Sequence, residues 1–206
     1  MECGLQSAIF KQKSRLKSAF LVKSKVYFME WSTSNHRPPH LYMDDVWYFV
    51  TISTLNKSKI LCTDSHLKLW VNGLKETAIK LNIDLAAWVI LPNHSHLLFM
   101  PKLGRDISAF IKQLNGRTSR ELNLLDQTPG RKVWYSYWDI CIRDERGFWT
   151  RFNYIHYNPV KHGFADQAED WPFSSYHFHL QNDDQDWLTQ CYETYSSPDL
   201  FDDDKF

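Results

Sequence analysis

Two histidines separated by one residue are the first feature of the sequence that could do chemistry. They lie in His94-Ser95-His96, directly after Pro92-Asn93, where a turn is expected. Side chains alternate between the two faces of a strand, so both imidazoles would point the same way in an extended segment and could share one metal ion. The pattern alone also fits two exposed or hydrogen-bonded histidines, and both interpretations remain open at this point.

A tyrosine and an asparagine further along the chain have a second spacing that could do chemistry. Tyr154 and Asn158 are four residues apart, which places them on the same face of a helix. Tyr154 could present a phenol as a nucleophile, and Asn158 could present an amide oxygen as a metal ligand. The alternative is that Tyr154 packs in the core and Asn158 only ends the helix before Pro159.

The hydrophobic pattern predicts the elements that would position these side chains. β-Branched and aromatic residues predict strands over 46–52, 86–91, 94–100 and 133–142. Helical spacing predicts a helix with Asp64 or Ser65 as its N-cap and further helices from about 106 and from about 146. The order β-α-β-β-α-β is the split βαβ pattern of ferredoxin-like folds. We therefore expect an α+β domain with one antiparallel sheet, helices on one face, and a C-terminal helix that bears the tyrosine.

Charge is unevenly distributed along the 206 residues although the net charge is zero. Residues 1–43 hold seven Lys/Arg against two acidic residues, and residues 181–206 hold one against eight. A basic arm is a common footprint of proteins that bind phosphate backbones, but it also fits a solvated terminus. We expect a basic, loosely attached arm over 1–36, a folded domain over 37–180 and an acidic tail over 181–206.

The positions of the cysteines indicate the redox state of the cellular compartment in which the protein is expected to work. Cys3, Cys62, Cys141 and Cys191 are scattered without a CxxC pair, so neither disulfides nor a structural zinc site is expected, and the pattern is typical of a reducing cytoplasm. No apolar run approaches the length of about 18 residues that a membrane helix needs. We expect a soluble cytoplasmic protein.

Several motifs in a fixed order make the chain resemble a known family. Pro92-Asn93-His94-Ser95-His96-Leu97-Leu98 is followed by Tyr154-Ile155-x-x-Asn158-Pro159-Val160-Lys161-x-Gly163, and these are accompanied by Arg37–Tyr42, Tyr48–Thr51 and Trp171–Tyr176. Over about residues 37–180 the chain resembles the REP-associated tyrosine transposases, in the single-tyrosine branch of the HUH endonuclease superfamily. Ser95 departs from the bulky hydrophobic residue usual there, and we expect this to affect packing more than chemistry.

The resemblance implies a reaction and a set of roles. It implies that His94, His96 and Asn158 hold Mg²⁺ or Mn²⁺, and that Tyr154 attacks single-stranded, hairpin-forming repeat DNA to give a covalent 5′-phosphotyrosine intermediate. Imidazole ligands suit manganese or zinc better than magnesium, which prefers oxygen, so the choice of metal stays open. The resemblance favours a monomer, with a dimer possible.

Basic residues near the predicted site are candidates for phosphate contacts, although ordinary surface charge fits each of them equally well. The candidates are Arg37, Arg131, Lys132, Arg143, Arg146, Arg151 and Lys161. Two other functions stay open: a non-catalytic DNA-binding protein that keeps the fold, and a metal-dependent hydrolase of another phosphate ester in which Tyr154 belongs to the core.

Overall fold

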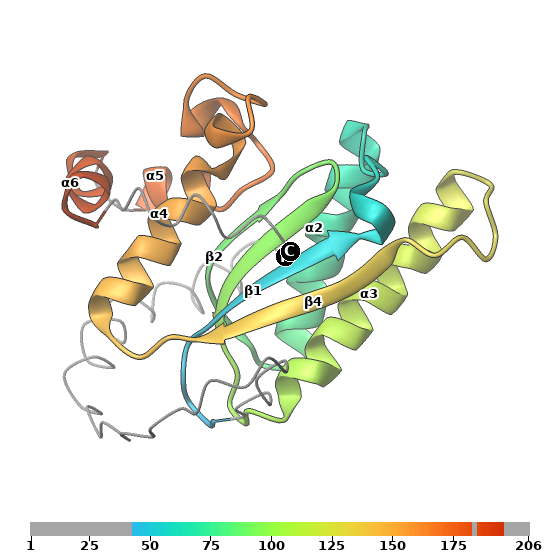
Figure 1. Cartoon of the computed structure of the whole chain (residues 1–206), viewed down its shortest axis with the longest axis horizontal. Coiled ribbons are helices and arrows are strands. Elements are labelled where there is room, and N and C mark those ends of the chain that lie inside the picture. The colour runs from blue at the N-terminus through green and yellow to red at the C-terminus, as the bar shows by residue number, and fades with distance from the viewer. Residues whose placement is uncertain (1–42, 183–184, 196–206) are drawn as a thin grey trace.

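The computed structural model describes residues 43–182 and 185–195, and Figure 1 shows their arrangement. The predicted arm over 1–36 and Arg37 lie outside the described residues. The elements, in order, are β1 (Tyr48–Thr54), the 3-10 helix η1 (Leu55–Lys57), α2 (Asp64–Lys80), β2 (Asp84–Ile90), β3 (His94–Met100), α3 (Asp106–Leu125), β4 (Trp134–Cys141), α4 (Glu145–Lys161), the 3-10 helix η2 (Ala168–Asp170), α5 (Tyr176–Asn182) and α6 (Gln185–Tyr195).

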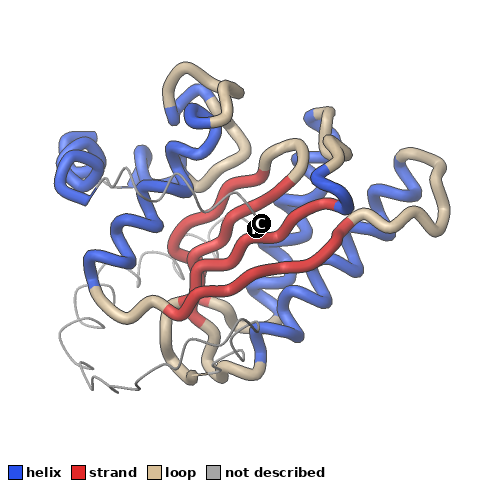
Figure 2. Tube along the Cα trace, viewed as in Figure 1, coloured by secondary structure: helices blue, strands red, loops and turns tan. Residues whose placement is uncertain are grey.

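The four strands form one antiparallel sheet in the order β2-β3-β1-β4. This order, visible in Figure 2, confirms the predicted α+β class and the βαββαβ sequence of elements. The β2–β3 hairpin closes through a hydrogen bond from the amide of Leu91 to the carbonyl of His94 at 2.8 Å, as the Pro92-Asn93 turn predicts. The sheet therefore has β1 and β3 at its centre, and β3 carries both histidines.

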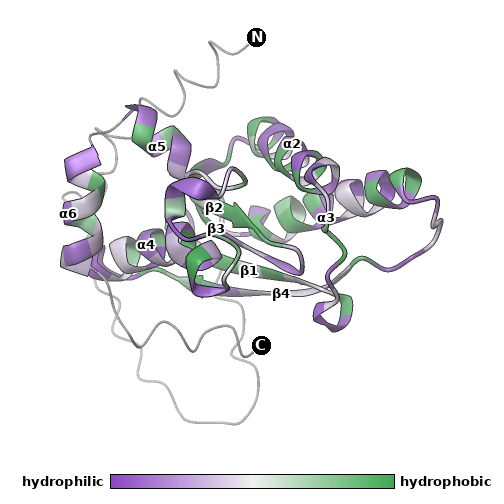
Figure 3. Ribbon diagram, turned by 90° about the horizontal axis from the view of Figure 1, so that it is seen from above, coloured by the Kyte–Doolittle hydropathy of each residue, from purple (hydrophilic) through white to green (hydrophobic). Residues whose placement is uncertain are grey.

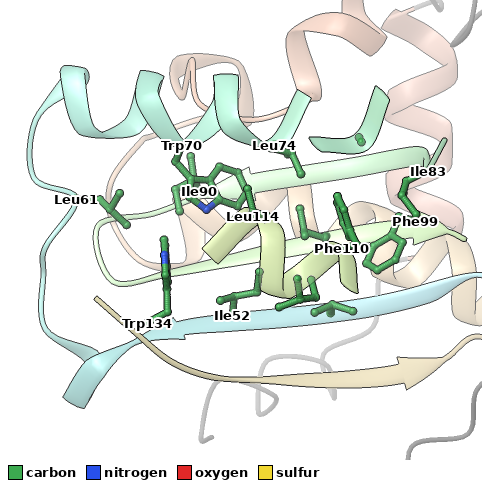
Figure 4. Close-up of a cluster of buried hydrophobic side chains, with 14 of the residues drawn as sticks. Ile52, Leu61, Trp70, Leu74, Ile83, Ile90, Phe99, Phe110, Leu114 and Trp134 are labelled. Atoms are coloured by element: carbon green, nitrogen blue, oxygen red, sulfur yellow. The ribbon is translucent and has the colours of Figure 1, made fainter. Parts of the chain in front are cut away.

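The first core lies between one face of the sheet and helices α2 and α3. Figure 4 shows Trp70 and Leu74 of α2 packed toward Phe110 and Leu114 of α3 above the strands. At Gly73 a Cβ would meet the Cγ2 of Thr118 at 2.9 Å, so the glycine lets the two helices approach closely. These two helices cover the face on which helices were expected.

The opposite face of the sheet is covered by α4, and α6 packs against α4 in turn. Figure 3 shows α4, α5 and α6 grouped apart from α2 and α3. A second core joins the sheet to α4 through Phe49 of β1 and Phe152 of α4, and it includes the buried Leu188 and Cys191 of α6. Part of the segment expected as an acidic tail is thus a helix that contributes to a core.

The boundaries of several elements differ slightly from those predicted. Helix α2 is capped by Thr63, whose side chain accepts a hydrogen bond from the amide of His66, and not by Asp64 or Ser65. Strand β1 is extended to Thr54, because that residue's amide donates to the carbonyl of Asn93 at 2.9 Å. Among residues 43–182 and 185–195, no helix is both long and apolar enough to cross a membrane.

Candidate active site

The two histidines of β3 share the sheet face that carries α4. Their neighbours Leu97 and Phe99 belong to the core under α2 and α3, whereas Leu98 belongs to the core under α4, as strand alternation requires. The imidazole centroids of His94 and His96 are 4.9 Å apart, and the residues are only 8% and 0% exposed. The predicted common orientation of the pair is confirmed.

Each histidine is held through its Nδ1 atom by a polar neighbour. The Nδ1 of His94 lies 2.8 Å from the Oδ1 of Asn93, and the Nδ1 of His96 lies 2.9 Å from the Oγ1 of Thr51. Phe49 also stacks on the His96 ring at 5.3 Å between centroids. An amide oxygen only accepts hydrogen bonds, so the Nδ1 of His94 donates to Asn93 in the tautomer that forms this bond.

Helix α4 places its two predicted residues against the two histidines. The Oδ1 of Asn158 lies 3.2 Å from the Nε2 of His94, and the Tyr154 ring meets the His96 ring edge-on at 5.1 Å between centroids. Asn158 is fully buried and Tyr154 is 6% exposed. The helix begins at the cap Asp144, whose Oδ1 accepts from the amide of Gly147 at 2.6 Å. Residues about 60 positions apart in the sequence thus form one cluster.

The donor set of this cluster fits a divalent cation. Both ring nitrogens of His94 face an amide oxygen, that of Asn93 at 2.8 Å and that of Asn158 at 3.2 Å, and a neutral imidazole has only one N–H to donate. A cation shared by His94 Nε2 and Asn158 Oδ1 would satisfy the second contact. The Nδ2 of Asn158 is buried without a hydrogen-bond partner among the described residues. No hydrogen bond of this nitrogen therefore explains why the amide is buried at this position. The described residues contain no group of three or more His, Cys, Asp or Glu with metal-binding geometry, and the predicted set has two histidines and one amide.

A third imidazole lies beside the pair. His162, the C-terminal cap of α4, has its ring centroid 5.0 Å from that of His94. No role was predicted for His162, although it lies four residues after Asn158 and so shares its helix face. This four-residue spacing is the sequence signal that could have identified His162 as a neighbour of the predicted metal ligands. Thr51 was also missed, because its contact with His96 depends on the β1–β3 register.

Two of the predicted basic residues lie at this cluster, on the same helix as the tyrosine. The Nζ of Lys161 is 3.4 Å from the hydroxyl of Tyr154 and 5.0 Å from the centroid of its ring. The guanidinium carbon of Arg151 lies 5.4 Å from the centroid of the Phe49 ring, which in turn meets Tyr154 edge-on at 5.9 Å.

The other predicted basic residues lie around β4 and the start of α4. Arg131 bonds to Asp126 at 2.6 Å and to Asn123 at 3.0 Å, so its guanidinium already has acidic and amide partners. Lys132 is exposed, with its Nζ 5.6 Å from the centroid of the Tyr135 ring. Arg143 and Arg146 are exposed in the β4–α4 connection and the first turn of α4.

Two neighbours of the tyrosine in sequence point elsewhere. The Nε2 of His156 lies 2.7 Å from the Oγ of Ser175, and burial lowers the pKa of this histidine well below its usual value of 6.5, with the nearby His179 adding to the effect. Tyr157 stacks on Tyr192 of α6 at 3.8 Å, and burial raises its pKa to about 12. Tyr154 is therefore the tyrosine of α4 that lies against His96 of the strand pair.

Comparison with known proteins identifies the family to which the chain belongs. The family described as "Transposase IS200 like" matches residues 42–158, and the chain belongs to this family of transposases. It is similar to the REP-associated tyrosine transposase of Escherichia coli, with 28% identity over 137 residues that cover 64% of this chain and 76% of that relative. A protein of Haemophilus influenzae assigned to the same group is 31% identical over 140 residues, covering 63% of this chain and 79% of that protein.

The fold is also similar to a solved structure. That structure is a REP-associated tyrosine transposase bound to a REP hairpin; it superposes with a TM-score of 0.61 and 24% identity, covering 72% of this chain and 86% of that one. At this identity the likeness concerns the fold.

Proposed function

We propose that this protein is a metal-dependent endonuclease and strand transferase for single-stranded DNA, with Tyr154 as its nucleophile. One observation carries the proposal. A single helix, α4, brings Tyr154 against His96 and Asn158 against His94 on one face of the sheet. The nucleophile of a single-tyrosine transposase must lie beside the ions that bind the scissile phosphate, and this geometry meets that requirement.

The residues that would hold the metal are His94, His96 and Asn158. A Mg²⁺ or Mn²⁺ ion bound there would act as a Lewis acid on the scissile phosphate. The hydrogen bonds that join the two Nδ1 atoms to Asn93 Oδ1 and Thr51 Oγ1 orient the rings for this role, as outer partners of metal-bound histidines commonly do. With three protein ligands, positions would stay open for phosphate oxygens.

The covalent step belongs to Tyr154. Its phenolic oxygen forms a bond to phosphorus, the bond from phosphorus to the 3′ oxygen breaks, the phenolic proton passes to solvent, and the 3′ oxygen takes up a proton. The product is a 5′-phosphotyrosine and a free 3′-hydroxyl, and the phosphodiester energy is kept for joining to a second DNA end. The ring contacts with Phe49 and His96 hold the phenol in place for this attack.

For the substrate we propose DNA that folds into hairpins. Support comes from the relative whose structure contains a REP hairpin and from two cations of α4, Lys161 beside the tyrosine and Arg151 over Phe49. Further cations around β4 and the start of α4 are Lys132, Arg143 and Arg146. Since genomic DNA would be the substrate, we expect the protein to act in the cytoplasm and, as the resemblance suggests, as a monomer.

Covalent capture of DNA tests this function. We expect the full chain, incubated with end-labelled hairpin oligonucleotides and Mn²⁺ or Mg²⁺, to give a slowly migrating adduct on a denaturing gel. Tyr154→Phe should abolish the adduct, because the variant keeps the ring contacts but has no oxygen to attack. Tyr157→Phe is the matched control and should keep it, because Tyr157 packs against α6.

The same gel separates the alternatives. Binding without cleavage would support a non-catalytic DNA-binding protein, and cleavage without an adduct would support a metal-dependent hydrolase. An adduct that persists in Tyr154→Phe would mean that another residue is the nucleophile.

A further inference from the structure

The side chain of Lys161 lies against the atom that the proposed reaction makes nucleophilic. Its Nζ is 3.4 Å from the Tyr154 hydroxyl and donates a hydrogen bond to it. The same Nζ lies 5.0 Å from the centroid of the phenol ring. A lysine that only contacted the DNA backbone would not need to lie within hydrogen-bonding distance of the tyrosine oxygen, as Lys161 does.

The helix geometry explains why this contact forms. Lys161 follows Tyr154 by seven residues, which is close to two turns, so both side chains lie on one face of α4 with Asn158 between them. A cation in the last turn of a helix is also favoured by the helix dipole. The contact therefore follows from local structure.

The Tyr154 ring is held by aromatic neighbours, and its hydroxyl is the atom to which Lys161 donates a hydrogen bond. The ring meets Phe49 and His96 edge-on at 5.9 and 5.1 Å between centroids, and the residue is buried. A buried phenol that loses its proton during attack places negative charge in a poorly solvated position, which is costly without a nearby positive group. Arg151 is the other cation of α4 near this cluster, but it lies over Phe49.

We propose that Lys161 is a catalytic residue that donates a hydrogen bond to the Tyr154 oxygen and stabilises the negative charge on that oxygen. This inference rests on the proposed function. In the attack, charge develops on the phenolic oxygen as its proton passes to solvent and its bond to phosphorus forms. In rejoining, the incoming 3′-hydroxyl loses its proton to solvent as its oxygen bonds to phosphorus, and the Tyr154 oxygen leaves with the electron pair of the broken bond and is then protonated from solvent. Lys161 assists both directions, since a charged donor makes the stronger hydrogen bond to an anionic oxygen.

The first test separates rate from binding. We expect Lys161→Met to lower the rate of adduct formation at saturating hairpin DNA by about 100-fold, the scale for removing one donor to a developing oxyanion. The Kd for DNA should change far less. Lys161→Arg keeps the charge and should retain more of the rate. Lys75→Met serves as comparator, because this exposed lysine lies on α2, on the other side of the sheet from Tyr154, and its loss should change neither the rate nor the Kd.

The second test locates the oxygen on which Lys161 acts. A substrate with sulfur in place of the bridging 3′ oxygen has a better leaving group. If Lys161 stabilised the leaving 3′ oxygen, this substrate would restore the rate of Lys161→Met. We expect the 100-fold defect to persist, because the attacking oxygen is unchanged.

The outcomes distinguish the two proposals. If the wild-type protein forms no Tyr154-dependent adduct, the proposed function fails. If it does, and Lys161→Met matches its rate at saturating DNA or is rescued by the sulfur substrate, only the role of Lys161 fails. Thermal unfolding of each variant checks the fold, and Lys161→Gln replaces Lys161→Met if the latter does not fold.

Discussion

The two imidazoles share a strand face, yet each has its own environment. His94 is held by its neighbour in sequence, Asn93, whereas His96 is held by Thr51 from the adjacent strand. Between them lies Ser95, on the opposite face, where it pairs with Ile52 of β1 and Ile90 of β2. One tripeptide therefore supplies two side chains to the candidate active site and one to the sheet face that carries the first core.

Ser95 gives a prediction about stability at the scale of a residue. It is fully buried, and its hydroxyl has no hydrogen-bond partner among the described residues. Since an unsatisfied buried hydroxyl is costly, we expect Ser95→Ala to raise the free energy of unfolding by about 1 kcal/mol, measured by urea denaturation. Ser136→Ala, at an exposed position of β4, is the control. Equal or lower stability in Ser95→Ala would show that the hydroxyl is satisfied in solution.

At the scale of elements, α4 is tied to the sheet by the segment that carries the Trp171–Tyr176 motif. Ser174 forms a bridge with Val89 at the β2 edge, and the Ser175 amide donates to the carbonyl of Trp88 at 2.9 Å. The Ser175 hydroxyl then meets His156 of α4. The motif therefore covers a sheet edge and fixes the helix that bears Tyr154, which gives it a structural role near the active site.

The buried His156 predicts how stability depends on pH. Its pKa in the folded protein lies well below its unfolded value near 6.5, so as the pH falls the unfolded chain binds a proton first. The contribution of neutral His156 is complete above pH 6.5 and is lost progressively below it, with a slope of up to about 1.4 kcal/mol per pH unit. We expect His156→Gln to have a flatter profile than the wild type between pH 6.5 and 5. Parallel profiles in denaturant titrations would contradict this.

At the scale of the whole molecule, the sheet separates two cores, of which only the second lies on the face that carries the candidate active site. The core under α2 and α3 is built from apolar side chains, whereas the face under α4 combines apolar packing with the histidines, Tyr154 and Asn158. Helix α6 completes the second core, since the Nδ2 of Asn153 donates to the carbonyl of Cys191 at 2.9 Å and Trp187 meets Trp149 at 5.6 Å.

Helix α6 gives a prediction at this scale. We expect a chain that ends at Asn182 to have a melting temperature at least about 5 °C lower than the wild type, because it loses the buried Leu188 and Cys191 and uncovers Trp149. A chain that ends at Tyr195 is the control, because it keeps α6 and loses only residues 196–206. Equal melting temperatures for the two truncations would mean that α6 adds nothing to the second core.

The sequence by itself determined the order of the elements and, within β3 and within α4, which functional residues share a face. Alternation along β3 is a local property, so it put both histidines on one face, and the four-residue helical spacing put Tyr154 with Asn158. The Pro92-Asn93 turn and the hydrophobic periodicity likewise act over a few residues, which explains why the hairpin and the helices were predicted nearly to their ends.

Only the tertiary structure decided which partners meet across the fold. Whether α4 would lie on the histidine face could not be read from spacing, because it depends on which sheet face α2 and α3 leave uncovered. The contacts of Thr51 with His96 and of His162 with His94 follow from strand register and from that docking. Lys161 was predicted as a phosphate contact from its charge, and its place at the Tyr154 oxygen emerged from the conformation of one helix packed against one sheet.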